Sequence, residues 1–560
     1  MRRLLTLLCL LLALPVLTVL AAWLSFDAAA LAVLRHQAET VLPGYVAQSL
    51  GLAAGVALGV VLLGVASAVA VAMFAFPGRA LFEWALLLPL AMPGYVLAYA
   101  YTDALQFSGP LQVALRAAFG WQGALWPDVR SLWGAVLLFV LCLYPYVYLL
   151  TRAALAEAAA QPLEAARLLG AGLVRRIRDV ALPLVRPAIV AGTALALMET
   201  LADYGVGSYF GLSTFTTGIY RAWLSMNDAT AAAQLASMLL VAVALLLAAE
   251  RQAQSRMRFA GSRHGQSAAG ELRAITLPGA ARWALTFGCA LPVLLGFVLP
   301  TAWLCVMLWR EAMGNLAGLP LARFAQWAWS SFQLAAMAAA MATLLALAVG
   351  FALRLPRRGP AEGGGRLFRL GVRVLQLGYA VPGAVVALGI LLPVAWLQAH
   401  WPASGIAALF TGTLAGLLFA YLVRFSAVAL QSVESGYTRL PRSMDETSRV
   451  LGAGRLRLFF GVHLPLLSRS AWTAALLVFV DTMKELPATL LLRPFGSDTL
   501  AVVGYNLARD ERLAEAALPS LAIVAVGLLP VVLLSRTIGR RRAEARAPAV
   551  PATRPAAAYL

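Results

Sequence analysis

The order of apolar and polar residues along this chain of 560 residues predicts a membrane protein. Apolar runs of about 20 residues recur throughout, long enough to cross a bilayer core of ~30 Å as helices. Short polar, arginine-rich segments separate them. We therefore predict an all-α polytopic fold with about twelve spans, at residues 4–23, 50–75, 84–104, 132–154, 184–202, 229–249, 283–309, 327–353, 370–397, 405–431, 466–488 and 518–538.

Two polar segments interrupt this pattern with the same internal spacing. Residues 164–183 read EAARLLGAGLVRRIRDVALP, and residues 446–465 read ETSRVLGAGRLRLFFGVHLP. We call them the first and the second island. In each, a glycine lies six positions after the glutamate and a proline nineteen positions after it, and the islands are 282 positions apart. This repetition indicates a duplicated protein with one special cytoplasmic element per half.

The first island predicts a helix-turn-helix elbow. Good helix formers occupy 164–169, the glycines of 170–172 allow a sharp turn, and 173–180 can form a second short helix. Pro183 suits the first turn of the following span, where its missing N–H costs nothing. An interfacial loop that binds anionic lipid is the alternative. Two copies with identical spacing favour a docking surface that is used twice.

The repeat divides the chain into two halves of similar size. We predict a first domain at 1–250, a cytoplasmic linker at 251–282, a second domain at 283–538 and a basic disordered tail at 539–560. Pro93-Gly94 and Pro382-Gly383 match in the third span of each half, as hinge candidates or fixed kinks. Because both halves have six spans and the same orientation, their pseudo-twofold axis should lie along the membrane normal.

Composition and charge agree with this topology. Hydrophobic residues make up 61% of the chain and charged residues 12%, unlike any soluble globule. The formal net charge is +19, and Lys484 is the only lysine. The arginines gather in the islands, the linker and the tail. The tendency of cytoplasmic loops of membrane proteins to carry positive charge explains them better than nucleic-acid binding does. Both termini should therefore be cytoplasmic.

Sequence motifs give no support for an enzyme. The four cysteines lie in apolar runs without CxxC spacing, and the four histidines are scattered, so neither residue type predicts a metal site. No Ser/His/Asp or Cys/His constellation occurs. The chain has no GxxxxGK[ST] loop, so it cannot cradle ATP phosphates itself.

The islands resemble the EAA loops of permease subunits in bacterial ABC importers. Glu164-Ala165-Ala166, Gly170 and Leu182-Pro183 match that motif, and the second island keeps Glu446, Gly452 and Leu464-Pro465 but has Thr447 and Ser448 in place of the alanines. The resemblance implies two tandem six-helix, type I importer domains of the binding-protein-dependent inner membrane component family. It also implies a homodimeric ABC ATPase that binds ATP and Mg²⁺ and docks on both islands, a periplasmic or lipid-anchored substrate-binding protein, surrounding membrane lipids, and a place in the bacterial inner membrane.

Three further segments narrow the resemblance to fused, two-domain permeases of ferric-iron importers. They are ADYG at 202–205, FTTGIYRAW at 215–223 and MKELPATL at 483–490. The resemblance implies iron transport by alternating access, with no cofactor in this chain. A permease for thiamine or another small cationic solute is the alternative within the class. A secondary transporter driven by an ion gradient is the alternative outside it.

Ionisable residues at the ends of the fifth spans suggest a substrate pathway. Such residues are costly inside a membrane and usually face protein or water. We expect a polar, net-negative path lined by the candidates Glu199, Asp203, Tyr204, Asp481, Lys484 and Glu485. Carboxylate oxygens suit a hard cation. In the alternative, Lys484 only neutralises Asp481 or Glu485.

Overall fold

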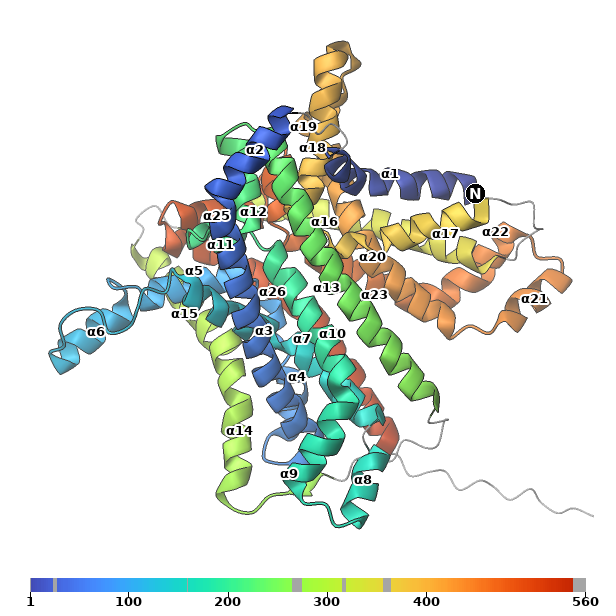
Figure 1. Cartoon of the computed structure of the whole chain (residues 1–560). Helices are drawn as coiled ribbons and strands as arrows, with labels where there is room; N and C mark the ends of the chain where they lie inside the picture. The colour runs from blue at the N-terminus through green and yellow to red at the C-terminus, as the bar shows by residue number, and fades with distance from the viewer. Residues whose placement is uncertain are drawn as a thin grey trace, which may run out of the picture.

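The computed structural model describes residues 2–23, 28–158, 160–263, 274–314, 319–355 and 364–546. Most of these residues are helical (Figure 1), apart from two short parallel strands, β1 (Phe74–Ala75) and β2 (Ile275–Thr276). Eleven helices in the described ranges are long and apolar enough to cross a membrane, and one sharply bent pair raises this number to twelve. The predicted all-α fold with about twelve spans is therefore confirmed.

The helices fall into two series of similar order. The first half consists of α1 (Arg2–Ala21), α2 (Ala28–Glu39), α3 (Leu42–Met73), α4 (Arg79–Ala85), α5 (Gly94–Leu105), α6 (Pro110–Phe119), α7 (Leu132–Ala158), α8 (Ala160–Leu168), α9 (Leu173–Arg175), α10 (Leu182–Ala202), α11 (Gly205–Tyr209), α12 (Phe215–Tyr220) and α13 (Ala229–Arg263). The second half consists of α14 (Ala280–Val293), α15 (Leu299–Gly314), α16 (Leu321–Arg354), α17 (Gly364–Leu375), α18 (Gly383–His400), α19 (Ile406–Gly412), α20 (Leu414–Thr438), α21 (Arg442–Val450), α22 (Arg455–Leu458), α23 (Leu464–Met483), α24 (Pro487–Leu492), α25 (Leu500–Arg509) and α26 (Leu513–Arg546).

The third predicted span of the first half is broken, which corrects the expectation of one kinked helix at 84–104. After α4 and a 3₁₀ turn at Leu88–Ala91, the chain turns by 88° into α5. Met92 and Pro93 both have extended backbones, with ψ of 110° and 144°. Proline excludes its predecessor from helical dihedrals and lacks an N–H, so the helix ends there instead of bending.

The second half is broken at the matching place, so the expectation of one span at 370–397 is also wrong. The helix α17 ends at Leu375, and α18 starts at Gly383 after extended dihedrals at Val381 and Pro382. The next predicted span, 405–431, starts too early. Thr413 has an extended backbone and caps α20 at its N-terminus, so the short helix α19 precedes the span as a separate element.

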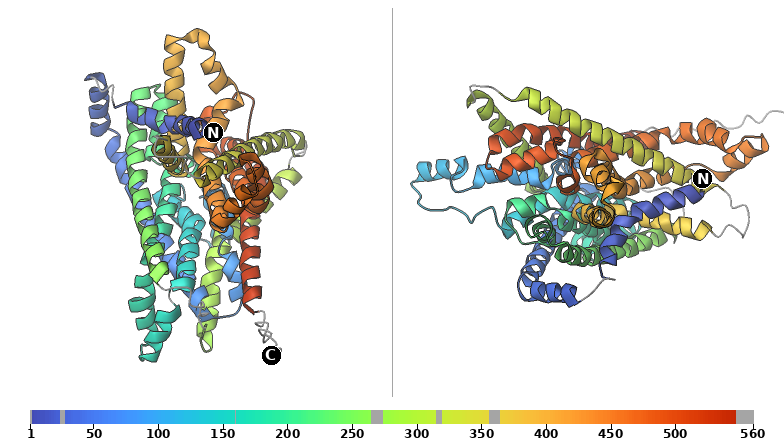
Figure 2. Two further views of the ribbon diagram at one scale, coloured as in Figure 1. Left: turned by 90° about the vertical axis from the view of Figure 1, so that its right-hand side faces the viewer. Right: turned by 90° about the horizontal axis from the view of Figure 1, so that it is seen from above.

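Each half places its first helix against the other half. The helix α1 packs on α17 and α18, beside which it lies in Figures 1 and 2. Thr18 donates a hydrogen bond to the carbonyl of Gly389 at 2.6 Å, and a Cβ on Gly389 would lie 2.0 Å from the carbonyl oxygen of Pro15. Reciprocally, Trp303 of α15 donates to Asp103 of α5 at 2.9 Å. The exchange ties the halves into one body.

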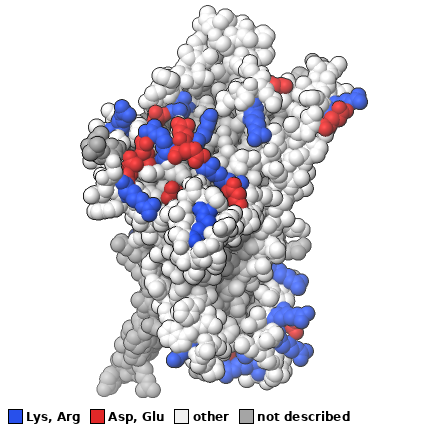
Figure 3. Space-filling view, turned by 90° about the vertical axis from the view of Figure 1, so that its left-hand side faces the viewer, with Lys and Arg blue, Asp and Glu red and all other residues white. Residues whose placement is uncertain are grey.

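On the face of the molecule that Figure 3 shows, charged side chains gather mainly toward the two ends. Figure 3 shows blue groups along one end, mixed blue and red groups toward the other, and a white zone between them. The helices α8 and α9 lie at the lower end of the first-half helices, whereas α21 and α22 lie at the right-hand end of the second-half helices (Figure 1). Each island thus sits at the far end of its own bundle.

The predicted linker and tail are only partly described. The helix α13 continues to Arg263, well beyond the predicted span end at 249, and residues 264–273 of the linker lie outside the described residues. The helix α26 continues to Arg546, whereas the prediction has a disordered tail that begins at residue 539. Residues 547–560 lie outside the described residues as well.

Candidate functional site

A polar cavity of about 130 Å³ lies between the two halves. The helix breaks of the two halves contribute to its walls. The other walls come from α7 and α10 of the first half and from α20 and α23 of the second half. The lining residues are Leu90, Met92, Pro93, Gly94, Tyr95, Phe139, Cys142, Leu143, Tyr146, Glu199, Ala202, Asp203, Tyr379, Arg424, Phe425, Asp481, Lys484, Glu485 and Pro487. Five of the six residues predicted for the substrate pathway are brought together here.

The four carboxylates of the cavity occupy equivalent positions in the halves. Asp481 lies 282 positions after Glu199, and Glu485 lies 282 positions after Asp203, the separation that also relates the islands. Asp203 accepts a hydrogen bond from the N–H of Val206, and Glu485 accepts one from Ala488, both at 2.8 Å. These carboxylates therefore cap the short helices α11 and α24, whose first N–H groups lack partners in the helix.

Two cations neutralise the carboxylates of the second half. Lys484 Nζ lies 2.9 Å from Asp481 Oδ1, one helical turn away, so Lys484 forms the pair that the alternative to its pathway role expects. Arg424 Nη1 lies 2.7 Å from Glu485 Oε2, and these two side chains are only 10% and 4% exposed. An ion pair this deeply buried holds both groups in place, since either charge alone would be costly there.

Sequence reasoning missed Arg424. The signal was available, because an arginine within the long apolar run of α20 is an unusual and expensive residue. Its Nε is buried without a hydrogen-bond partner, and its equivalent in the first half is Cys142, which also lines the cavity.

The carboxylates of the first half have no such partners. Among the described residues, no Lys, Arg or His nitrogen lies within 4 Å of Glu199 or Asp203. Glu199 instead accepts a hydrogen bond from the hydroxyl of Tyr379, across the interface of the halves, at 2.9 Å. With four carboxylates and two cations, the cavity carries a net negative charge when all of these groups are ionised.

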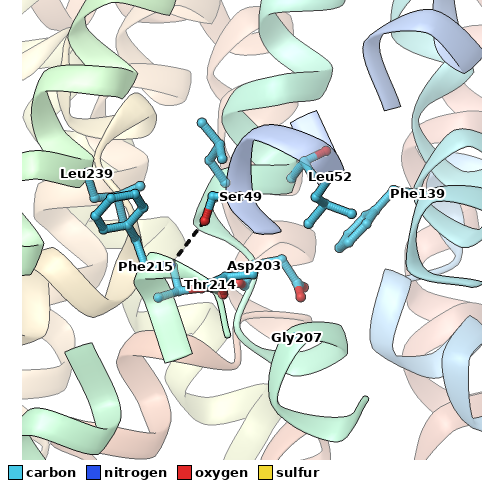
Figure 4. Close-up of a pocket in the computed structure, with 11 residues that line it drawn as sticks. Ser49, Leu52, Phe139, Asp203, Gly207, Thr214, Phe215 and Leu239 are labelled. Carbon is cyan, nitrogen blue, oxygen red and sulfur yellow. Dashed lines mark hydrogen bonds between the residues drawn. The ribbon is translucent and has the colours of Figure 1, made fainter. Parts of the chain in front are cut away.

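Tyr204 is not among the residues that line this cavity. It stacks on Tyr220 with ring centroids 3.7 Å apart and accepts a hydrogen bond from Tyr505 at 3.4 Å. Figure 4 shows Asp203 from the side of a second, much smaller cavity of about 10 Å³. There Ser49 accepts the N–H of Phe215 at 3.3 Å. Tyr204 thus belongs to a cluster of tyrosines with Tyr220 and Tyr505.

Two of the four predicted hinge residues line the same space. Pro93 and Gly94 line the cavity directly. A Cβ on Gly383 would lie 2.7 Å from Glu485 Oε1 and 3.1 Å from Arg424 Nη1, so a glycine is required for the ion pair to approach α18. Pro382 ends the preceding segment and is not among the lining residues. That the chain bends at these breaks during function stays a prediction.

Both islands form a helix, a turn and a second helix, as predicted. Glu164 lies on α8 and Glu446 on α21, and the turns contain Gly170 and Gly452 in the left-handed conformation, with φ of 78° and 81°. One detail differs from the expectation. The second helix does not end before the proline but continues as one helix, Leu173–Ala202 or Arg455–Met483, through a π-helical turn. Pro183 and Pro465 follow that wider turn, which can absorb a missing N–H.

The tips of the islands expose apolar side chains in matched pairs. Leu168, Leu169 and Val174 of the first half are 82%, 87% and 76% exposed. The residues 282 positions later are Val450, Leu451 and Leu456, which are 87%, 79% and 75% exposed. Contiguous exposed apolar groups of this kind mark interaction surfaces.

Metal coordination is not evident in the part of the chain that the structure describes. No group of three or more His, Cys, Asp or Glu side chains has a geometry that could hold a metal ion there. A cation in the cavity would therefore meet dispersed carboxylates and tyrosines and not a tight ligand set.

Comparisons with known proteins agree with this architecture. The chain is 25% identical over 491 residues to the Fe(3+)-transport system permease protein FbpB 2 of Haemophilus influenzae, which covers 86% of this chain and 87% of that protein. It is 24% identical over 520 residues to y4fN of Sinorhizobium fredii, named as an ABC transporter permease protein, with coverage of 87% and 86%. Over 167 residues it is 32% identical to PhnV of Salmonella typhimurium, named as a 2-aminoethylphosphonate transport system permease protein, with coverage of 30% and 60%.

The sequence profile of one protein family matches both halves of the chain. It covers residues 60–259 in the first half and 359–543 in the second. The relatives are transport subunits, which agrees with a role other than that of an enzyme. The chain therefore belongs to the family of binding-protein-dependent transport system inner membrane components, as a permease with two tandem domains.

Proposed function

We propose that this permease imports ferric iron, driven by ATP hydrolysis in a separate ATPase subunit. The observation that carries the proposal is the cavity between the halves, where four carboxylates at equivalent positions meet only two cations. Oxygen ligands suit a hard cation such as Fe³⁺. The relative of similar length from Haemophilus influenzae, named as an Fe(3+)-transport permease, supports the same cargo.

The two islands serve, in this proposal, as the coupling elements for the ATPase. Their exposed apolar tips match each other position by position, as a surface that binds two identical subunits requires. The contact residues would be Glu164, Ala165, Ala166, Gly170, Pro183, Glu446, Gly452 and Pro465. ATP and Mg²⁺ would be bound by the ATPase dimer, so this chain itself needs no cofactor.

Transport would proceed by alternating access of the central cavity. A loaded substrate-binding protein docks at the ends of the helices opposite the islands, and closure of the ATPase dimer draws the islands together. The halves then rock about their interface, and the cavity opens toward the binding protein, takes the cargo and returns toward the islands on hydrolysis. This scheme requires the islands and both termini to lie in the cytoplasm.

A 2-aminoethylphosphonate importer is the second candidate. One specific observation favours it, because Arg424 and Lys484 line the same cavity as Glu199 and Asp203. A zwitterion could place its phosphonate near the cations and its ammonium near the carboxylates of the first half. Relatives named as phosphonate permeases match about a third of the chain.

The test is binding-protein-stimulated ATP hydrolysis in proteoliposomes. The full chain would be reconstituted with its co-purified ATPase, and loaded binding proteins for ferric iron, 2-aminoethylphosphonate and thiamine would be added in turn. We expect stimulation with the ferric protein alone. Stimulation by the phosphonate or thiamine protein would keep the importer and change its cargo, whereas cargo uptake without any ATPase would indicate a secondary transporter.

A further inference from the structure

A buried polar cluster lies at the base of the second island. Its centre is Asp445, the residue directly before Glu446, which is only 5% exposed. Arg354, the last residue of α16, donates to Asp445 Oδ2 from Nε at 2.7 Å. His463 Nε2 lies 3.0 Å from Asp445 Oδ1, and its Nδ1 lies 3.2 Å from the hydroxyl of Tyr437, both within hydrogen-bond distance.

Arg354 also caps the C-terminal end of the neighbouring helix α20. Its two terminal nitrogens donate to the backbone carbonyls of Tyr437, Leu440 and Pro441 at 3.1, 2.9 and 2.9 Å. These carbonyls belong to the last turn of α20 and to the segment that enters α21. Carbonyls at a helix end have no partner within the helix, so the guanidinium supplies what the backbone lacks.

Four elements therefore meet at this buried polar cluster, which we call the polar node. Arg354 belongs to α16, Tyr437 to α20, Asp445 to α21 and His463 to the π-helical turn that continues into α23. The far end of α23 carries Asp481, which lines the central cavity. The node thus connects the second island to a helix that forms the cavity.

The first half has an apolar node at the equivalent place. Counting back 282 positions from Arg354, Tyr437, Asp445 and His463 gives Ala72, Leu155, Leu163 and Ala181, of which the last three are at most 4% exposed. The same separation relates Ser49 to Ser331, each of which accepts a backbone N–H near the other end of its helix, so the alignment holds along α3 and α16.

We propose that Arg354, Asp445 and His463 are positioning residues that transmit the movement of the second island to the cavity, and that the two islands are therefore not equivalent in coupling. The physical basis is direction. Charge-assisted hydrogen bonds fix the angle between the joined elements, whereas apolar contacts in the first half resist separation but allow sliding. The inference rests on the proposed function, since it assumes that the islands receive the ATPase.

The decisive variant transplants the apolar node of the first half into the second. It combines Arg354→Ala, Tyr437→Leu, Asp445→Leu and His463→Ala, which leaves no charge of this cluster buried without its partner. The readout is cargo taken up per ATP hydrolysed in proteoliposomes with the loaded binding protein. We expect this ratio to fall at least tenfold while ATP hydrolysis continues. A ratio within twofold of the parent protein would overturn the inference.

Two single variants keep the test decisive if the transplant fails to fold. His463→Gln retains an N–H donor for Asp445 and should hold the uptake ratio within about threefold, whereas His463→Ala should lower it at least tenfold. Equal effects of the two would overturn the inference. The matched control is Leu163→Ala in the first half, which should lower thermal stability without changing the ratio.

The controls also separate this inference from the proposed function. If the parent chain shows no stimulated ATP hydrolysis with any loaded binding protein, the proposed function fails. If the parent chain is coupled and the transplant is equally coupled, only the role of the polar node fails.

Discussion

Arg130 of the first half and Glu511 of the second half are joined by a bidentate ion pair, with Nη1–Oε1 and Nη2–Oε2 distances of 2.7 and 2.9 Å. Arg130 also donates to the hydroxyl of Tyr209 at 3.1 Å. Its hydrogen bonds hold the pKa of Glu511 below the usual value. Arg130 precedes α7, at the opposite end of that helix from the first island. In the proposed transport scheme, the pair therefore holds the halves together on the side where the cavity opens for the binding protein.

Breaking this pair should favour opening. We expect Arg130→Gln and Glu511→Gln each to raise ATP hydrolysis in the absence of binding protein about fivefold, because a partly exposed ion pair contributes about 1 kcal/mol. The double variant should add little to either single one, and the reversed pair Arg130→Glu with Glu511→Arg should restore low basal hydrolysis. Fully additive single effects would show that the two residues act independently.

The carboxylates of the first half should matter most for cargo, because no cation neutralises them. We expect Glu199→Gln with Asp203→Asn to lower uptake at least tenfold while the ATPase still co-purifies. The matched control is Glu434→Gln, a half-buried carboxylate that accepts from Gln376 at 3.1 Å and does not line the cavity. Normal uptake in the double variant would exclude these residues from the pathway.

Arg424 should be critical for stability through Glu485. Arg424→Met leaves a buried carboxylate without its cation, which costs about 3–5 kcal/mol in the free energy of unfolding. Replacing both residues, Arg424→Met with Glu485→Gln, should recover most of this loss in a denaturation experiment. The exposed pair of Arg35 and Glu39 provides the control, and Arg35→Met should leave the midpoint unchanged. A double variant as unstable as the single one would contradict the pairing.

Asp445 should make stability sensitive to acid. Burial alone would raise the pKa of this carboxyl, but hydrogen bonds from Arg354 and His463 outweigh it and hold the pKa below the usual value. A lowered pKa contributes stability that is fully present above the unfolded pKa of about 3.9 and is lost as the pH falls further. Thermal unfolding below pH 4 should therefore be less pH-dependent in Asp445→Asn than in the parent. An identical pH dependence of the unfolding temperature in the variant and the parent protein would contradict this assignment.

The turn of the first island offers a test of its geometry. Gly170 has a φ of 78°, whereas Gly172 has a φ of −63°, which any residue adopts. Alanine at 170 should cost about 1–2 kcal/mol because its Cβ is strained in the left-handed region. We expect Gly170→Ala to reduce the amount of co-purified ATPase severalfold and Gly172→Ala to leave it unchanged. Equal binding by both variants would show that the turn does not shape the docking surface.

Much of the architecture could be predicted from local patterns. The apolar runs indicated the spans because a bilayer of fixed thickness demands them, and the spacing of the islands revealed the duplication. The same separation of 282 positions also relates the cavity carboxylates, of which Glu199 and Asp481 both line the cavity. The local sequence pattern therefore shows which residues are equivalent in the two halves.

Contacts between distant elements could not be predicted in the same way. The ion pair of Arg424 and Glu485 joins residues 61 positions apart, and that of Arg354 and Asp445 joins residues 91 positions apart. The Pro-Gly sites were recognised, but whether a proline bends or ends a helix depends on what satisfies the freed backbone groups nearby. Tyr204 directly follows Asp203 in sequence, but it stacks on Tyr220 and is not among the residues that line the cavity.

The central claim is that ATP hydrolysis, received at the two islands, moves ferric iron through the cavity between the halves. The most direct measurement is the uptake of radioactive ferric iron into proteoliposomes that contain the chain and its ATPase, with the loaded binding protein outside. The account predicts uptake that requires ATP and disappears when Leu169 and Leu451 at the island tips are both replaced by Asp. Iron uptake that continues without ATP, or in that double variant, would contradict it.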